Sequence, residues 1–215
     1  QKTKYVRKNN NDSSWLVRDN FDIYSNALDW TEQPFVNIAT WRVRDIEVYP
    51  KKNSKKIFIY RDSIDEQNFK LQSMPKNFTL VDTHIANKIA SSLDKVNFIN
   101  LDERKKYKEF NTIFTAVLRT FDGLKIDVFS YNNNEKKWLA FDVSFDVSFR
   151  KELPIDGPKI VGMPKMPTVE EVKDEVIHLN QILKNWVFEV SEFNYEQLNR
   201  TFQSIIKPVD NKSSK

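Results

Sequence analysis

The dipeptide Asp122-Gly123 lies between two runs in which apolar and polar residues alternate, residues 112–121 and 124–131. Alternation with a period of two is typical of a β-strand that buries one face. Asp-Gly favours a two-residue turn, because both residues tolerate the positive φ angles that such a turn requires. The sequence therefore predicts a β-hairpin here, and with it an antiparallel sheet.

The stretch FDVSFDVSF, residues 141–149, follows this hairpin and fits two interpretations. Asp142, Ser144 and Asp146 have the D-x-S-x-D spacing that begins many calcium loops. Such a loop needs Gly at its sixth position and Glu at its twelfth. Those positions hold Val147 and Leu153. In a strand, Asp142 and Asp146 would also lie about 13 Å apart, too far to share one ion.

We therefore expect FDVSFDVSF to form a third strand rather than a metal site. The residues expected to face the core are Phe141, Val143, Phe145, Val147 and Phe149. The residues expected on the other face are Asp142, Ser144, Asp146 and Ser148.

Earlier in the chain, three short extended runs precede a helical pattern. Residues 43–48 predict a strand, residues 57–60 its hairpin partner, and residues 68–75 a third strand that ends at Pro75. A stripe of apolar residues at helical spacing then predicts an amphipathic helix with Asp82 or Thr83 as its N-cap. The stripe consists of Ile85, Ile89 and Leu93.

After the third strand of the second half, residues 154–167 form a proline-rich loop. Thr168 and Glu171 have the spacing of a capping box, which predicts the start of a helix over residues 168–185. Residues 186–193 predict a strand, and residues 194–207 a helix that ends at Pro208. Its apolar face would contain Leu198, Phe202 and Ile206.

The two halves are weakly similar, which leaves two interpretations of the fold. Residues 39–101 and 112–207 each end in a hairpin, a short strand and an amphipathic helix. This is either a duplicated β-β-β-α unit or a chance similarity of two ordinary segments. In both cases the fold class is α+β, with antiparallel sheets and amphipathic helices.

The chain is expected to contain one α+β domain over residues 15–207. Residues 1–14 are expected to be a flexible basic arm, because Lys2, Lys4, Arg7 and Lys8 occur there without an acidic residue nearby. Such an arm is either a solvated terminus or a contact for nucleic acid or lipid head groups. Residues 208–215 are expected to be a flexible tail.

Composition excludes several kinds of site. The chain has no Cys, which removes disulfides, thiol nucleophiles and thiolate metal sites. It has three Gly, too few for a glycine-built phosphate loop, and two His, His84 and His178. The net charge is only +4, which disfavours nucleic acid as a partner. Basic residues do flank Trp41 and Trp138, although packing in the sheet explains both tryptophans. We expect no cofactor and no metal.

Six acidic residues are candidates for pairs that perform acid–base chemistry. They are Asp122, Asp127, Glu170, Glu171, Asp174 and Glu175. Turn formation explains Asp122, and the helix dipole favours acids in the first turns of residues 168–185. Because no nucleophile motif accompanies them, we assign no catalytic residue and expect a protein that is not an enzyme.

Three aromatic residues crowd the segment before the first clear strand: Trp30, Phe35 and Trp41. An aromatic loop of this kind either closes one end of the core or presents an interaction patch. The core plug is the simpler interpretation. If the segment is exposed, these three residues are the candidate patch for a protein partner.

The chain resembles a bacterial domain of unknown function, family 4340. Residues 14–50 follow its opening pattern, through Trp15, Leu28, Asp29, Trp30, Ile38, Arg42, Val43, Ile46 and Val48. Residues 115–145 are similar to its T-F-D-G-L hairpin and the next strand, and residues 179–206 to its closing strand and helix. The similarity runs from Trp15 to Lys207, with Phe188 where the family commonly has Tyr.

The resemblance implies a location and a partner but no activity. Domains of this family follow an N-terminal membrane anchor, face the periplasm, and are associated with auxiliary proteins of gliding-type ABC transporters. We therefore expect an accessory interaction domain at the periplasmic side of a bacterial inner membrane, with its anchor upstream of Gln1. Cytoplasmic location is the alternative. The alternative function is a ligand-binding domain or a hydrolase-like enzyme with a pocket between the two halves.

Overall fold

The structure is a computed structural model of the chain. It describes residues 3–9, 12–18, 28, 31–50, 54–109, 111–133, 135–150 and 164–209. The chain divides into two compact units, residues 1–32 and residues 33–215.

The first unit contains a hairpin in which β1 (Thr3–Arg7) pairs antiparallel with β2 (Ser14–Arg18). The expectation that residues 1–14 are a flexible basic arm did not predict this hairpin. In both strands the apolar residues are adjacent rather than alternating, Tyr5-Val6 in β1 and Trp15-Leu16-Val17 in β2, so the period of two that predicts a strand is missing here. The boundary expected between residues 14 and 15 falls at the start of β2 rather than at the end of a unit.

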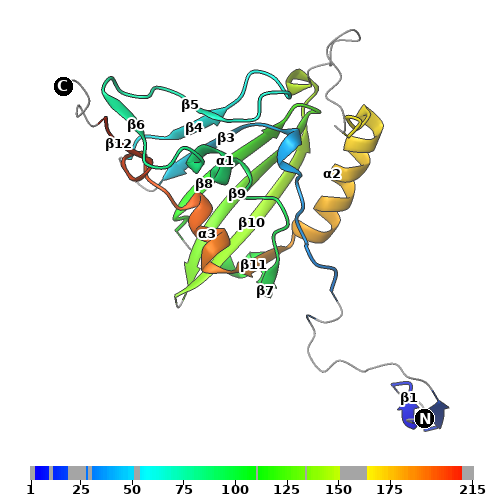
Figure 1. Ribbon diagram of the computed structural model, residues 1–215. Coiled ribbons are helices and arrows are strands. Elements are labelled where there is room, and N and C mark those ends of the chain that lie inside the picture. The colour runs from blue at the N-terminus through cyan, green and yellow to red at the C-terminus, as the bar shows by residue number, and fades with distance from the viewer. Residues whose placement is uncertain are drawn as a thin grey trace. The chain divides into compact units, whose positions relative to one another are not determined.

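The second unit is built on an eight-stranded antiparallel sheet, shown in Figure 1. The strands lie in the order β5 (Lys70–Leu71), β4 (Ile57–Tyr60), β3 (Val43–Pro50), β8 (Phe114–Thr120), β9 (Leu124–Asn133), β10 (Lys136–Phe145), β11 (Trp186–Val190) and β7 (Phe98–Glu103). A separate pair joins β6 (Phe78–Leu80) to β12 (Ile206–Pro208). The α+β class is confirmed.

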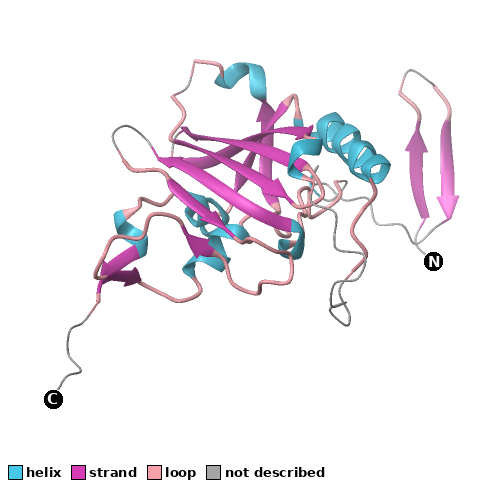
Figure 2. Cartoon of the chain, turned by 90° about the horizontal axis from the view of Figure 1, so that it is seen from above, coloured by secondary structure: helices cyan, strands magenta, loops and turns pink. Residues whose placement is uncertain are grey.

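Helices α1 (Ile85–Ala90) and α3 (Glu192–Leu198) pack on one face of this sheet and contact each other, and α2 (Val169–Leu183) runs beside β10 (Figures 1 and 2). Short 3-10 helices occur at Thr40–Arg42 (η2), Arg104–Tyr107 (η3), Val147–Phe149 (η4) and Gln203–Ile205 (η5). No helix among the described residues has the length and apolar character needed to span a membrane.

The core lies between the sheet and the two small helices. Alternate residues of the three central strands face it and are buried: Phe114, Ala116, Leu118, Leu124, Ile126, Val128, Leu139, Phe141 and Val143. Burying one of the Val, Leu, Ile or Phe side chains among them stabilises the fold by about 1.5–3 kcal/mol. This uninterrupted alternation is the reason why the hairpin prediction from the sequence succeeded.

The β8–β9 turn differs in length from the two-residue turn expected. Three residues, Phe121, Asp122 and Gly123, separate the strands, and only Gly123 has a positive φ, 98°. A Cβ at Gly123 would lie 2.7 Å from the ring of Phe145. The position therefore requires glycine both for its positive φ angle and for lack of space. Asp122 is buried and uses its carboxylate for tertiary contacts, described below.

FDVSFDVSF forms a strand over only its first half. Phe141 and Val143 face the core as expected, but β10 ends at Phe145. Asp146 then accepts a hydrogen bond from the Ser148 backbone N–H (2.9 Å) and starts η4. Val147 is 65% exposed rather than buried. The expected facing is wrong after Phe145, because the Asp146 side chain competes locally with the strand.

The helical predictions were correct in place but too long. Thr168 and Glu171 form both hydrogen bonds of a capping box at the start of α2. The helix expected over residues 194–207 instead ends at Leu198, and Ile206 belongs to β12. Pairing of β12 with β6 is a contact distant in sequence, which helix periodicity cannot reveal.

The two halves do not keep the same order of elements. β5 is an edge strand, and β6 intervenes between it and α1. β11 is an interior strand that leads directly into α3. The correspondence of β5–α1 with β11–α3 therefore does not describe a duplicated β-β-β-α unit. The strands β3–β4–β5 of the first half and β8–β9–β10 of the second half belong to one continuous sheet.

Candidate functional site

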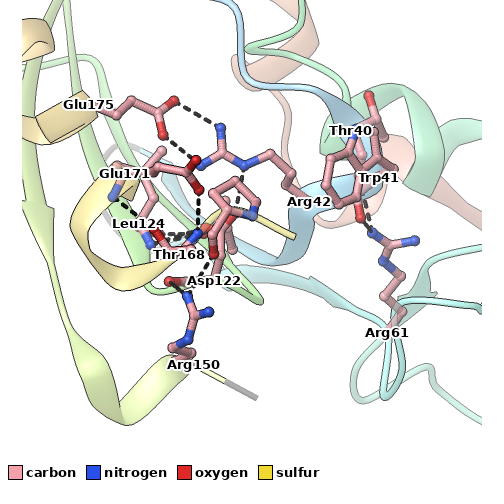
Figure 3. A network of polar contacts seen from close by, with 12 residues as sticks. Thr40, Trp41, Arg42, Arg61, Asp122, Leu124, Arg150, Thr168, Glu171 and Glu175 are labelled. Carbon is pink, nitrogen blue, oxygen red and sulfur yellow. Dashed lines mark hydrogen bonds and ion pairs between the residues drawn. The ribbon is translucent and has the colours of Figure 1, made fainter. Parts of the chain in front are cut away.

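A buried ionic network joins three elements around Arg42, as Figure 3 shows. The Nε atom of Arg42 donates to Asp122 (2.6 Å), and its two terminal nitrogens donate to the two carboxylate oxygens of Glu175 (2.8 and 2.6 Å). Arg42 is 8% exposed and Asp122 1%. The network therefore fastens η2, the β8–β9 turn and α2 to one another.

The chemistry of this network is structural. Burial alone would lower the pKa of Arg42, but hydrogen bonds to Glu175 and Asp122 raise that pKa above its ordinary value. Both carboxylates are thereby held by a permanent cation. Asp122 also accepts a hydrogen bond from the Thr120 hydroxyl. Arg150 extends the network by donating to the Asp122 carbonyl oxygen (3.3 Å).

The other acidic residues weighed as acid–base groups do not converge. Asp127 pairs with Lys125 (2.8 Å) on the sheet, and Glu171 serves the capping box. Among the described residues, no three His, Asp or Glu side chains gather as metal ligands. The carboxylates of FDVSFDVSF have separate partners, since Asp142 binds Arg104 and Asp146 caps η4.

The candidate aromatic patch is not assembled on the surface. Phe35 is 7% exposed and stacks on Phe188, with 4.3 Å between ring centroids. It also meets Phe98 and Phe141 edge to face. Phe35 is therefore unavailable as a patch residue, because it fills the core. Trp41 lies half-buried in η2, and Trp30 falls outside the described residues.

A second buried arginine, Arg61, holds the segment around Trp41 in place. Arg61, 6% exposed, donates to backbone carbonyl oxygens of three segments: Thr40 in η2 (3.2 Å), Val43 at the start of β3 (2.8 Å) and Glu66 in the loop after β4 (2.9 Å). Trp41 contributes its carbonyl oxygen to the same guanidinium, as Figure 3 shows. Burial lowers the pKa of Arg61 to about 10, so the side chain is still charged at neutral pH.

Trp138, weighed as a base-stacking residue, is buried. It belongs to a small cluster with Tyr107, Tyr131, Ala140 and Val187 on the sheet face opposite the main core. Its ring centroid lies 5.5 Å from that of Tyr107. The cluster anchors η3 to the sheet, and so positions the basic residues of η3.

A pocket of about 610 Å³ lies beside this cluster, where η3 meets the end of α2. We call it the basic pocket. Its principal lining residues are Arg104, Lys105, Lys108, Tyr131, Lys184 and Trp186. Four of these are cations, and Glu103 is the acid in the lining. Aromatic and cationic groups together favour an anionic ligand with some apolar surface.

Arg104 organises the basic pocket. Its backbone N–H donates to Asn185 (2.9 Å), which fixes η3 against the start of β11. Its guanidinium forms a two-point contact with Asp142, with one bond of 3.0 Å, and lies over the ring of Phe129. The hydrogen bond to Asp142 raises the pKa of Arg104. Arg104 is thus held in place by its own partners.

The lysines of the basic pocket differ in whether they form an ion pair with another described residue. Lys105 pairs with Glu103 (2.8 Å). Lys108 and Lys184 form no ion pair with any residue that the structure describes, and both are exposed. These two ammonium groups are therefore the ones best placed to meet an anion from solution.

Sequence reasoning missed the basic pocket. No role was assigned from the sequence to the charged run LDERKKYKEF, residues 101–110. The signal was the basic run Arg104–Lys108 with Tyr107 inside it, since Tyr107 is buried and the lysines beside it are exposed. No family of known proteins, no curated protein and no solved structure matches the chain.

Proposed function

We propose that this chain is a non-catalytic interaction domain that holds an acidic segment of a protein partner in the basic pocket. The observation that carries the proposal is the excess of cations around the pocket, with Lys108 and Lys184 free of ion pairs to described residues. A peptide with acidic residues next to an aromatic one would match both the lysines and the walls formed by Tyr131 and Trp186.

The proposal also includes a subcellular location. We propose that the domain faces the periplasm as an accessory part of an ABC-type transport system, anchored in the inner membrane through a segment upstream of Gln1. The resemblance of residues 15–207 to family 4340 supports this location. Fractionation and protease protection of the full-length protein test it, and recovery in the cytoplasm free of membrane would reject it.

Binding by the pocket can be measured with a labelled acidic peptide. The probe is a short fluorescent peptide of Glu and Tyr, and its partner probe has Gln in place of each Glu. We expect the Lys108→Gln/Lys184→Gln variant to bind the acidic probe about tenfold more weakly, and binding to weaken with added salt.

The matched control carries Lys76→Gln and Lys207→Gln, the same loss of charge at exposed positions away from the basic pocket. It should bind as the unaltered protein does. Equal loss in both variants, or equal binding of the Glu and Gln probes, would show that the pocket recognises no acidic segment. Thermal unfolding of each variant checks that removing Lys184 from the end of α2 leaves the fold intact.

A further inference from the structure

A second pocket, of about 480 Å³, lies where α1 meets α3, and we call it the α1–α3 pocket. One side is the turn after α1, with Ser92, Asp94 and Lys95. The other side is α3 and the residues after it, with Phe193, Gln197 and Arg200. None of these residues lines the basic pocket.

Unpartnered polar atoms concentrate in the α1–α3 pocket. Among the described residues, four buried side-chain atoms have no hydrogen-bond partner, and three of them belong to residues that line this pocket: Ser92 Oγ, Gln197 Oε1 and Arg200 Nε. Ser92 is only 6% exposed. Leaving such an atom unpaired costs about 1–3 kcal/mol. Three such atoms on residues that line one pocket are groups that a polar ligand would satisfy.

The three atoms specify what the ligand must offer. Arg200 Nε can only donate, so it requires an acceptor, and a carboxylate is the strongest one. Gln197 Oε1 can only accept, so it requires an N–H or O–H group. The Ser92 hydroxyl can do either. Their combination fits a carboxylate with an N–H group next to it.

Charge and shape agree with this chemistry. The cations Lys88, Lys95 and Arg200 line the pocket against one acid, Asp94. Asp94 already accepts a hydrogen bond from Thr40 (3.1 Å). Phe193 is 73% exposed at the pocket, which offers its ring to an apolar side chain. The volume exceeds what a lone carboxylate needs.

We propose that the α1–α3 pocket binds an α-carboxylate flanked by an N–H group, as in a free amino acid or the C-terminus of a peptide. Arg200 and Ser92 hold the carboxylate, Gln197 accepts the adjacent N–H, and the ligand side chain lies against Phe193. The site is independent of the basic pocket, so either proposal can fail without the other.

The test compares three probes by isothermal titration calorimetry: leucine, N-acetyl-leucine and N-acetyl-leucinamide. We expect the amide, which lacks the carboxylate, to bind about tenfold more weakly than the better of the two acids. Preference for leucine identifies a free amino acid as the source, and preference for N-acetyl-leucine identifies a peptide C-terminus. Equal binding of acid and amide, or no saturable binding of any probe, overturns the proposal and leaves water as the partner of the three atoms.

Two variants separate binding from structure. Gln197→Leu and Arg200→Met should each weaken binding of the acid about tenfold, while the thermal midpoint stays level or rises, because each removes an unpartnered buried atom. Gln203→Leu, at an exposed glutamine in η5, is the matched control and should change neither. Loss of stability in the two variants would assign these side chains to the fold and overturn the proposal.

Discussion

Arg42 shows how one residue can matter through its partners rather than through its own charge. Its guanidinium is the counterion of two carboxylates, one of which, Asp122, is almost completely buried. A buried ion pair adds little compared with a well-packed apolar group, whereas removing one member leaves an uncompensated charge. The residue is therefore expected to be far less replaceable than an exposed arginine.

We predict that Arg42→Met lowers the free energy of unfolding by about 3–5 kcal/mol, because Asp122 and Glu175 lose their common cation. Urea denaturation followed by tryptophan fluorescence measures the change. Adding Asp122→Asn and Glu175→Gln to Arg42→Met should restore a large part of the loss. Arg18→Met, at an exposed arginine of β2, is the control and should stay within about 0.5 kcal/mol of the parent. An Arg42→Met variant that is as stable as Arg18→Met would contradict the prediction.

At the scale of elements, α2 completes an edge of the sheet. β10 pairs with β11 only around Trp138 and Leu139, so its later residues lack a strand on that side. The amide of Asn180 on α2 fills this place: it donates to the Val143 carbonyl oxygen (2.8 Å) and accepts from the Val143 N–H (3.4 Å). One side chain thus replaces a neighbouring strand at this residue.

We predict that Asn180→Ala lowers the free energy of unfolding by about 1–2 kcal/mol, because it leaves both Val143 backbone groups without their partner. Hydrogen exchange of the Val143 amide should accelerate in the same variant. Gln181→Ala, at the exposed next position of α2, provides the comparison and should show neither effect. Unchanged exchange at Val143 would mean that the Asn180 contact does not protect this edge.

Sequence patterns identified elements whose signals are local. The Thr168–Glu171 capping box and the Gly123 turn could be predicted because each depends on residues close together in the chain. The partner of β7 and the pairing of Arg42 with Glu175 could not, since they join residues far apart in the sequence. For the same reason both pockets were missed, as each is lined by segments that lie far apart in the sequence.

For the whole molecule, the carboxylates set the response to acid. Among the residues that the structure describes, seven carboxyl groups have pKa values below their ordinary values: Glu47, Asp65, Asp82, Asp102, Glu103, Asp146 and Glu171. A hydrogen bond from Lys106 lowers the pKa of Asp102. A hydrogen bond from the Thr168 backbone N–H lowers the pKa of Glu171. Burial raises the pKa of Glu47, but hydrogen bonds from Tyr49 and Lys56 lower it overall.

A carboxyl with a lower pKa in the folded state stabilises the fold above its unfolded pKa, which is about 4. That contribution is lost as the pH falls through the folded pKa. We therefore predict that stability changes little between about pH 7 and 5.5 through these groups, and decreases steadily below about pH 4.5. Urea midpoints at a series of pH values measure it, and a midpoint that rises on acidification would contradict the prediction.

The position of β7 in the sheet has a consequence for biosynthesis. β7 emerges from the ribosome well before β11, the strand beside it, and β6 likewise precedes β12. The β8–β9–β10 meander can pair as soon as it is made, whereas β7 and η3 must wait for the C-terminal segment. Because the basic pocket takes its lining from both sides of that late junction, a nascent or prematurely terminated chain would lack it. Only a chain that extends through β11 could then engage a partner there.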